Sequence, residues 1–284
     1  DYAGIGIIYN MDIFDKLGLA APTTFRALQD VCEKLEDAGI VPFAGLLKEN
    51  WSVGHFITLV HTALLKEKKI GLESFIADMG AGNTSYGVVD TAKLFNILDF
   101  YRENMNKTAA EMGGGEQQQS FAKGEAAMMV QGLWSYADAK KLNPSLNAYF
   151  IPFPVHNDPE MNVFYADVDS TFALSSQSAP EKQEAALKFI NWITSSEGRA
   201  LWLKEYKLIP PFKGIDVSAF DNPYIDLMKI VQAKEPMQWA FSQYPSDVFE
   251  DACKNGAQQY LLHKRTAEDV ISIIDTQWAS SVNK

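Results

Sequence analysis

The sequence predicts an α/β fold on two observations. Short apolar runs at residues 3–9, 40–46 and 126–130 have the length of buried strands. Longer segments with apolar residues at helical spacing separate these runs, and strands that alternate with helices are typical of α/β domains. A chain of 284 residues also exceeds what one small core requires, so we expect two lobes or one large α/β domain.

Residues 121–134 (FAKGEAAMMVQGLW) carry this pattern most clearly. Gly124 is the residue type that ends helices in a left-handed conformation, residues 126–130 suit a strand, and Gly132 precedes a new helical pattern. Open α/β sheets place ligands where a strand ends and a helix begins. Trp134 lies at such an edge, either as a core residue under the helix or as a flat apolar platform for a ligand.

The remaining elements follow from apolar periodicity and from capping residues such as Asn10. We expect helices at 11–17, 22–38, 51–66, 90–104, 181–194, 197–206 and 246–262, and two more that start at 222 and 266. Further apolar runs at 149–154 and 164–175 suit strands. We expect the Gly-rich segment 80–87 to be a linker, because it lacks the spacing and the lysine of a phosphate-binding loop, and 111–119 to be loose.

Composition excludes several classes of protein. The net charge of −11 argues against nucleic acid as a partner, because nucleic-acid-binding proteins need Lys/Arg patches. The sequence contains no run of about 18 apolar residues that could span a membrane. It opens on a strand-like run with no signal peptide, so we expect a processed or cut piece. Cys32 and Cys253 lie in helical patterns and are expected as buried free thiols, although a disulfide in an oxidising compartment stays open.

Motifs of nucleophilic and metal chemistry are missing from the sequence. Gly-x-Ser-x-Gly and CxxC do not occur. The four histidines are scattered, and His55 and His61 are six residues apart rather than the four that align two ligands on a helix. We therefore expect no metal site and no cofactor.

Two carboxylates stand out because Asp167 and Asp169 interrupt an apolar run. Residues two apart on a strand point to the same face, and carboxylates there are costly unless they are hydrogen-bonded. Three interpretations remain open for the pair. They are the paired acids of a glycoside hydrolase, acceptors for ligand hydroxyl groups, or caps of a turn.

Aromatic residues are abundant, with 6 Trp, 11 Tyr and 17 Phe. Several lie at the edges of expected elements, namely Trp51, Trp134, Trp239, Phe241 and Tyr244. A sugar site needs flat aromatic rings against the C–H faces of the sugar and carboxylates or amides at its polar rim. The three tryptophans together with Asp167 and Asp169 supply that mixture, although each Trp alone could equally be a core residue.

Four segments, in order, resemble the extracytoplasmic solute-binding proteins of carbohydrate ABC transporters, the family that includes maltose-binding protein. They are 9–25 (YNMDIFDKLGL…PTTF), 121–134 (FAKGEAAMMVQGLW), 186–212 (ALKFINWITSSEGRALWLKEYKLIPPF) and 256–278 (GAQQYLLHKRTAEDVISIIDTQW). Each segment alone is loosely similar to the family, and their common order makes the resemblance specific.

The resemblance implies a periplasmic-binding-protein-like fold of two α/β lobes joined by three crossover segments. These would be 2–10, 165–175 and 209–220. The second lobe would comprise 11–165 and 216–284, and 166–215 would hold hinge crossovers and helices of the first lobe. Because most of the first lobe is missing from the sequence, we expect a longer native protein and apolar helix residues without a partner, among them Phe189, Ile190, Ile193, Leu201 and Trp202.

The resemblance also implies a site and a function. Trp134 and Gly132 match the aromatic motif that stacks on sugar, Glu49 and Trp51 an acid and an aromatic at the cleft, and Asp167 and Asp169 the second crossover. Trp239 and Tyr244 would lie in a contacting C-terminal loop. The expected function is non-enzymatic binding of a mono- or oligosaccharide and delivery to ABC permease subunits, in a periplasm or at the cell surface through a lipid anchor on a missing N-terminus. The alternatives are a glycoside hydrolase and a binder of a non-sugar solute such as a peptide or polyamine.

Overall fold

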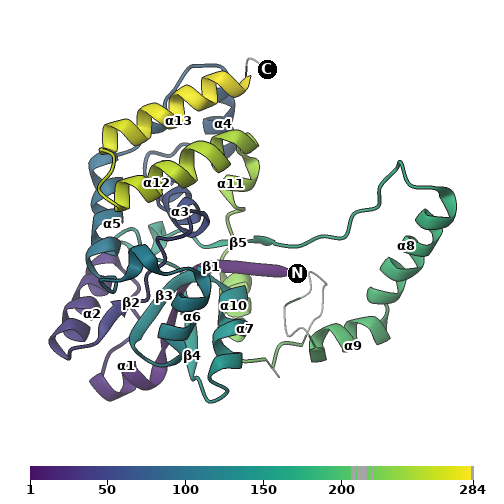
Figure 1. The fold of residues 1–284 in the computed structure, drawn as a ribbon, viewed down its shortest axis with the longest axis horizontal. Coiled ribbons are helices and arrows are strands. Elements are labelled where there is room, and N and C mark those ends of the chain that lie inside the picture. Colours follow the sequence, from purple (N-terminus) through teal and green to yellow (C-terminus); the bar gives the residue numbers. More distant parts are fainter. Residues whose placement is uncertain (206–208, 210–215, 219, 283–284) are drawn as a thin grey trace.

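The computed structural model describes residues 1–205, 209, 216–218 and 220–282. They form a body, in which helices cover both faces of one mixed sheet, and an arm that extends away from it (Figure 1). The predicted α/β class is confirmed. Most of the expected third crossover, 209–220, lies outside the described residues, as does the Pro-Pro end of the preceding helix.

The body contains five strands in the described ranges. They are β1 (Tyr2–Asn10), β2 (Val41–Phe43), β3 (Ala126–Gly132), β4 (Ala148–Ile151) and β5 (Tyr165–Val168). The order is β2-β3-β1-β4, and β5 pairs with the first half of β1. Strand β1 is antiparallel to β3, β4 and β5, whereas β2 and β3 are parallel.

The helices of the first half of the chain are α1 (Met11–Leu17), α2 (Phe25–Asp37), α3 (Trp51–Glu67), α4 (Leu72–Gly80), α5 (Thr91–Glu103), α6 (Gly114–Ala122) and α7 (Leu133–Leu142), with short 3-10 turns at Tyr86–Val88 and Ala109–Glu111. After β4 come a 3-10 turn at Pro159–Met161, α8 (Pro180–Ile193), α9 (Ser196–Glu205), α10 (Asn222–Ala233), α11 (Ala240–Gln243), a π-helical turn at Val248–Cys253, α12 (Lys254–Leu261) and α13 (Ala267–Val282).

Strand β1 lies at the centre of the core, because its two faces pack into two different hydrophobic clusters. Ile5 and Ile7 face the larger cluster, which includes residues of α2, α3, α5, α12 and α13. Ile8 faces the smaller one, with residues of α6, α7 and α10. This alternation is the period of two expected of a strand that is buried on both faces.

Helix α6 corrects the expectation that 111–119 is loose. Three glycines in a row disfavour a helix by propensity. The helix nevertheless starts at Gly114, because the Glu116 carboxylate accepts a hydrogen bond from the Gly113 N–H at 3.0 Å, one half of a capping box. Gln117 is fully buried and donates to the Ala44 carbonyl at 2.9 Å, so tertiary contacts outweigh local propensity here.

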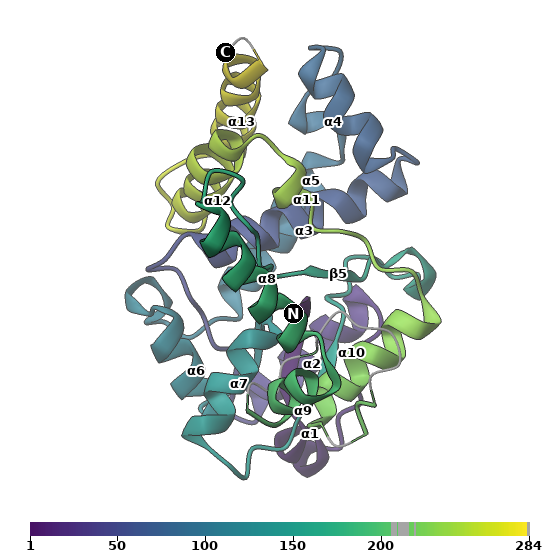
Figure 2. The same cartoon turned by 90° about the vertical axis from the view of Figure 1, so that its right-hand side faces the viewer.

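The arm consists of α8 and α9, which stand apart from the body in Figure 1. In Figure 2 the arm faces the viewer, with α8 in front of the body beside β5 and α9 below it. Helix α8 contains no buried residue. Phe189 and Leu201 are 45% and 43% exposed, and Ile190, Ile193 and Trp202 are partly exposed. The apolar side chains of these two helices therefore lack the cover that such residues usually have.

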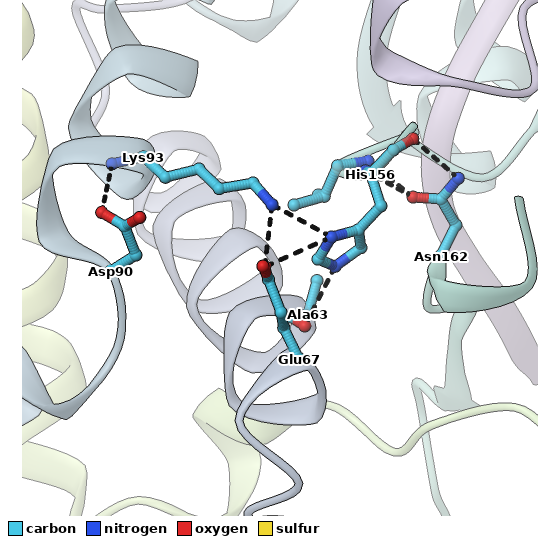
Figure 3. A network of polar contacts seen from close by, with 7 residues as sticks. Ala63, Glu67, Asp90, Lys93, His156 and Asn162 are labelled. Carbon is cyan, nitrogen blue, oxygen red and sulfur yellow. Dashed lines mark hydrogen bonds and ion pairs between the residues drawn. The ribbon is translucent and has the colours of Figure 1, made fainter. Parts of the chain in front are cut away.

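The buried His156, in the segment before β5, forms polar contacts with residues of α3 and α5 (Figure 3). His156 Nε2 lies 3.1 Å from the Ala63 carbonyl, and Lys93 Nζ lies 3.2 Å from His156 Nδ1 and 2.7 Å from Glu67. Asn162 accepts a hydrogen bond from the His156 N–H at 2.8 Å. Burial, and next the Lys93 ammonium, lower the pKa of His156, so its neutral ring fits a donor at Nε2 and an acceptor at Nδ1.

Cys32 and Cys253 are both buried free thiols. Burial raises the pKa of each thiol, which disfavours the reactive thiolate. In the part of the chain that the structure describes, no helix has the length and apolar character needed to cross a bilayer.

Candidate functional site

Three tryptophans meet in one open hollow with a volume of about 500 Å³. Trp51 begins α3, Trp134 lies in the first turn of α7, and Trp239 precedes α11. The lining residues are Trp51, His55, Trp134, Val168, Asp169, Trp239, Phe241 and Ser242. The ends of a strand and of three helices thus bring together residues that are far apart in the sequence.

The rings of the hollow have two orientations. The Trp239 and Phe241 rings are stacked at 5.2 Å and 24°, and Phe241 stacks on His55 at 4.2 Å and 15°. The Trp134 ring stands almost perpendicular to this stack, 6.0 Å from Trp239 at 81°. Trp239 is 5% exposed and forms the buried base of this stack, whereas Trp51, His55, Trp134 and Phe241 are partly exposed. The hollow therefore offers apolar surfaces in two planes at a corner.

His55 acts in this stack as a neutral ring. Burial, and next the nearby Lys254 ammonium, lower the pKa of its imidazole to about 3. Phe249, from the π-helical turn, is buried and lies parallel to His55 at 5.7 Å. The imidazole therefore contributes stacking area rather than positive charge at neutral pH.

Gly132 fixes the position of Trp134 by having no side chain. It is the last residue of β3 and the N-cap of α7. A Cβ atom at this position would lie 2.2 Å from two atoms of the Trp134 ring. The indole can fold back over the end of the strand only because residue 132 is glycine.

Glu49 lies beside the hollow rather than in its lining. Its Oε2 accepts a hydrogen bond from Trp51 Nε1 at 2.6 Å, and its Oε1 accepts one from the Gly114 N–H at 3.2 Å. Both carboxylate oxygens are thus bound to groups of the protein.

The two aspartates of the expected second crossover have different environments. Asp167 Oδ1 accepts from the Val168 N–H at 2.7 Å, and Oδ2 accepts from the Trp239 N–H at 3.2 Å. Asp169 is exposed and lines the hollow. Asp167 therefore connects β5 to the segment before α11, and Asp169 is the carboxylate among the lining residues.

Tyr244 lies in the core and does not line the hollow. It is 5% exposed, and its ring packs 4.7 Å from Trp278 at the α13 side of the body. Sequence reasoning did not single out His55 or Ser242 for the site. The spacing of Trp51 and His55, four residues apart on one helix, was the available signal, because such residues share a helix face.

Nothing in the described residues gathers metal ligands, since they contain no group of three or more His, Cys, Asp or Glu side chains able to hold an ion. The hollow is chemically an aromatic surface with one carboxylate and one hydroxyl group at its edge.

Comparison with protein families identifies the chain. Residues 1–200 match the family model described as bacterial extracellular solute-binding protein. The chain belongs to this family. The resemblance found in the sequence is thereby confirmed. No curated protein matches the sequence closely enough to add to this finding.

Solved structures of solute-binding proteins share the fold. A chitin oligosaccharide binding protein superposes with a TM-score of 0.85 at 22% identity, over 99% of this chain and 70% of that chain. The solute-binding protein RafE of Streptococcus pneumoniae, in complex with raffinose, gives 0.81 at 16%, over 99% and 71%. A manno-oligosaccharide-specific protein from Bifidobacterium animalis subsp. lactis, in complex with mannotriose, gives 0.69 at 17%, over 100% and 69%.

Proposed function

We propose that this solute-binding protein binds a carbohydrate, with the sugar in the hollow of Trp51, Trp134 and Trp239. The observation that carries the proposal is the meeting of three indoles from three separate segments around one hollow of about 500 Å³. Because the apolar C–H faces of a sugar pack on flat aromatic rings, such a corner suits a sugar better than a peptide backbone. The sugar ligands named for the structural relatives support the same class.

Polar groups at the edge of the hollow would select among sugars. Asp169 and Ser242 offer a carboxylate and a hydroxyl group to ligand hydroxyls. In this proposal Glu49, Gly132 and Asp167 help to position Trp51, Trp134 and Trp239, which they contact, whereas Tyr244 belongs to the core.

We propose further that closure of two lobes traps the ligand. The chain segments that lead toward the arm lie together, since Tyr2 pairs with both Val168 and Ile209. The arm, within the expected division 166–215, would belong to the first lobe, and its exposed apolar side chains would pack on the rest of that lobe. A ligand that contacts both lobes favours the closed state and shifts the population toward it.

Delivery to the permease subunits of an ABC transporter is the proposed outcome of binding. The family description places such proteins outside the cytoplasm. We propose an extracytoplasmic location, held to the cell surface by a lipid or free in a periplasm. No catalytic step is required for this role.

A hydrolase needs two carboxylates at the scissile bond. Both oxygens of Asp167 accept backbone N–H groups, which leaves Asp169 as the single carboxylate among the described lining residues. We therefore expect no reducing ends when the chain is incubated with oligosaccharides. Turnover by the purified protein, abolished in Asp169→Asn, would contradict the binding role.

A thermal-shift screen tests the proposed ligand class directly. A ligand at 100 times its Kd stabilises the native state by about 2.7 kcal/mol, so binding raises the Tm. We expect oligosaccharides to raise the Tm and peptides and polyamines to leave it unchanged. A shift with peptides or polyamines, but not with any sugar, would refute the assignment.

Two substitutions should weaken sugar binding to a similar extent. Trp134→Ala removes one stacking surface and should cost about 1–3 kcal/mol of binding free energy. Gly132→Ala should approach this loss, because its Cβ would lie 2.2 Å from the Trp134 ring and would displace it. Calorimetry with the sugar found in the screen measures both.

Gly71→Ala is the matched control for Gly132→Ala. Gly71 is also an N-cap residue with an extended backbone, and its added Cβ would meet nothing closer than Ser74 at 3.7 Å. The Gly71→Ala variant should bind the sugar with the same affinity as the parent chain. If Trp134→Ala also bound as tightly as the parent chain, Trp134 would be a core residue only.

A further inference from the structure

The Glu49 carboxylate is held between two N–H donors from different parts of the body. Trp51 Nε1 donates to Oε2 at 2.6 Å, and the Gly114 N–H donates to Oε1 at 3.2 Å. Glu49 is exposed to solvent, but its described hydrogen bonds engage both oxygens within the protein. The Trp51 ring that Glu49 binds lines the hollow, whereas Glu49 itself does not.

The Glu49 carboxylate is bound at the first turn of α6. Gly114 is the first residue of this nine-residue helix, where backbone N–H groups lack partners within the helix and negative charge is favoured. Gly113 precedes it, and a Cβ atom there would lie 2.5 Å from Glu49 Oε1. Because residue 113 is glycine, the carboxylate takes this place at the helix start without displacement by a side chain.

Helix α12 fixes the backbone on either side of Glu49. Gln258 donates to the Leu47 and Lys48 carbonyls at 2.8 and 3.2 Å. Asn50 donates to the Asn255 side chain at 2.7 Å instead of capping α3. The segment that carries Glu49 and Trp51 is therefore anchored to α12 through its backbone and to α6 through the carboxylate.

We infer that Glu49 is a positioning residue that sets the plane of the Trp51 indole before a ligand arrives. Gly113 and Gly114 form the backbone site that holds the Glu49 carboxylate. The inference rests on the proposed function, because it assigns Trp51 a ligand-facing role. A ring that is already ordered loses no rotamer freedom on binding, so the fixed indole gives affinity without a direct contact between Glu49 and the ligand.

The inference is tested first on the free protein, through the indole N–H signals in a ¹H–¹⁵N spectrum of the full chain. The signal of Trp51 is assigned as the one lost in Trp51→Phe. We expect Glu49→Ala to move it upfield, because this removes the carboxylate from Nε1, and Gly113→Ala to move it in the same direction by a smaller amount, because its Cβ displaces Oε1. Glu49→Gln should restore part of the shift through its amide oxygen. An unmoved Trp51 signal in Glu49→Ala and Gly113→Ala would overturn the inference, whatever the protein binds.

Gly115→Ala is the matched control, because its Cβ would meet no atom within 4 Å although it lies in the same first turn of α6. The control should leave the Trp51 signal in place. With the sugar found in the thermal-shift screen, Glu49→Ala and Gly113→Ala should bind about two- to tenfold more weakly, the ordinary cost of ordering one side chain. Unchanged affinity in both variants would overturn the link to binding, whereas a screen without any sugar hit refutes the proposed function and leaves the spectral test intact.

Discussion

Replacing Gly6 with alanine should lower the free energy of unfolding by about 3 kcal/mol, the upper end of ordinary overpacking costs. A Cβ at this position would lie 2.3 Å from the Ile151 carbonyl oxygen and 2.9 Å from the Phe150 ring. The oxygen belongs to β4, which is paired with β1 at Ile7, so it cannot move without breaking the ladder. Urea unfolding followed by circular dichroism measures the effect.

Two other glycines calibrate this result. Gly4→Ala meets the Leu227 Cδ1 atom at 2.7 Å, and because this is the far end of a flexible side chain the cost should be smaller, about 1 kcal/mol. Gly80→Ala, at the end of α4, meets nothing within 4 Å and should change stability by less than about 1 kcal/mol. If Gly6→Ala unfolded at the same urea concentration as Gly80→Ala, that result would contradict the close contact between β1 and β4 at Gly6. If Gly6→Ala did not fold at all, the free energies of unfolding of Gly4→Ala and Gly80→Ala would still test the packing around β1, because Gly4→Ala should be the less stable of the two.

The sequence was informative where local signals and tertiary packing agree. The junction of β3 and α7 follows from a helix-ending Gly124, which has a φ of 71°, an apolar run, and Gly132 before Trp134. It was misleading at α6, because three glycines argue against a helix. The capping contact of Glu116 with Gly113 is local, but the other contacts that hold α6 join it to residues distant in the sequence, namely Gln117 to Ala44 and Gly114 to Glu49.

In the candidate site, too, some residues could be predicted from the sequence and others could not. Aromatic residues at element edges predicted Trp51, Trp134 and Trp239, which meet around the hollow. Tyr244 has the same sequence context, but its ring packs on Trp278 of α13. The orientation of this side chain depends on a helix that is distant in the sequence, and neighbouring residues do not indicate it. The roles of Gly113 and Gly132 depend on distances between non-bonded atoms, which no spacing rule contains.

Buried neutral histidine should make the protein sensitive to acid, and His61 should have a large share in this effect. Its side chain is fully buried, its ring stacks on Tyr86 at 3.7 Å, and Nε2 lies 2.9 Å from the Tyr86 carbonyl. Burial lowers the pKa of His61 to about 3, with a smaller opposing effect of the bond to Tyr86. An unfolded histidine has a pKa of about 6.5.

Between those two pKa values the unfolded chain binds one proton more than the folded chain at His61. The stabilisation from the neutral ring is therefore fully present above about pH 6.5 and is lost as the pH falls, by about 1.4 kcal/mol per pH unit. At pH 5 the loss from this residue should reach about 2 kcal/mol. Unfolding in urea at several pH values between 7 and 5 gives the slope for the parent chain and for His61→Gln.

The slope should be flatter in His61→Gln by about 1.4 kcal/mol per pH unit, even though the substitution also lowers stability at pH 7. Taking the difference in slope removes the contributions of His55, His156 and the carboxylates, which both chains share. His263→Asn is the control, since His263 is exposed and has a φ of 56°, a backbone conformation that asparagine adopts readily. Its slope should match the parent chain. Equal slopes for His61→Gln and His263→Asn, or a His61 ring signal that titrates near pH 6.5 in the folded parent chain, would show that the ring takes up a proton in the native core.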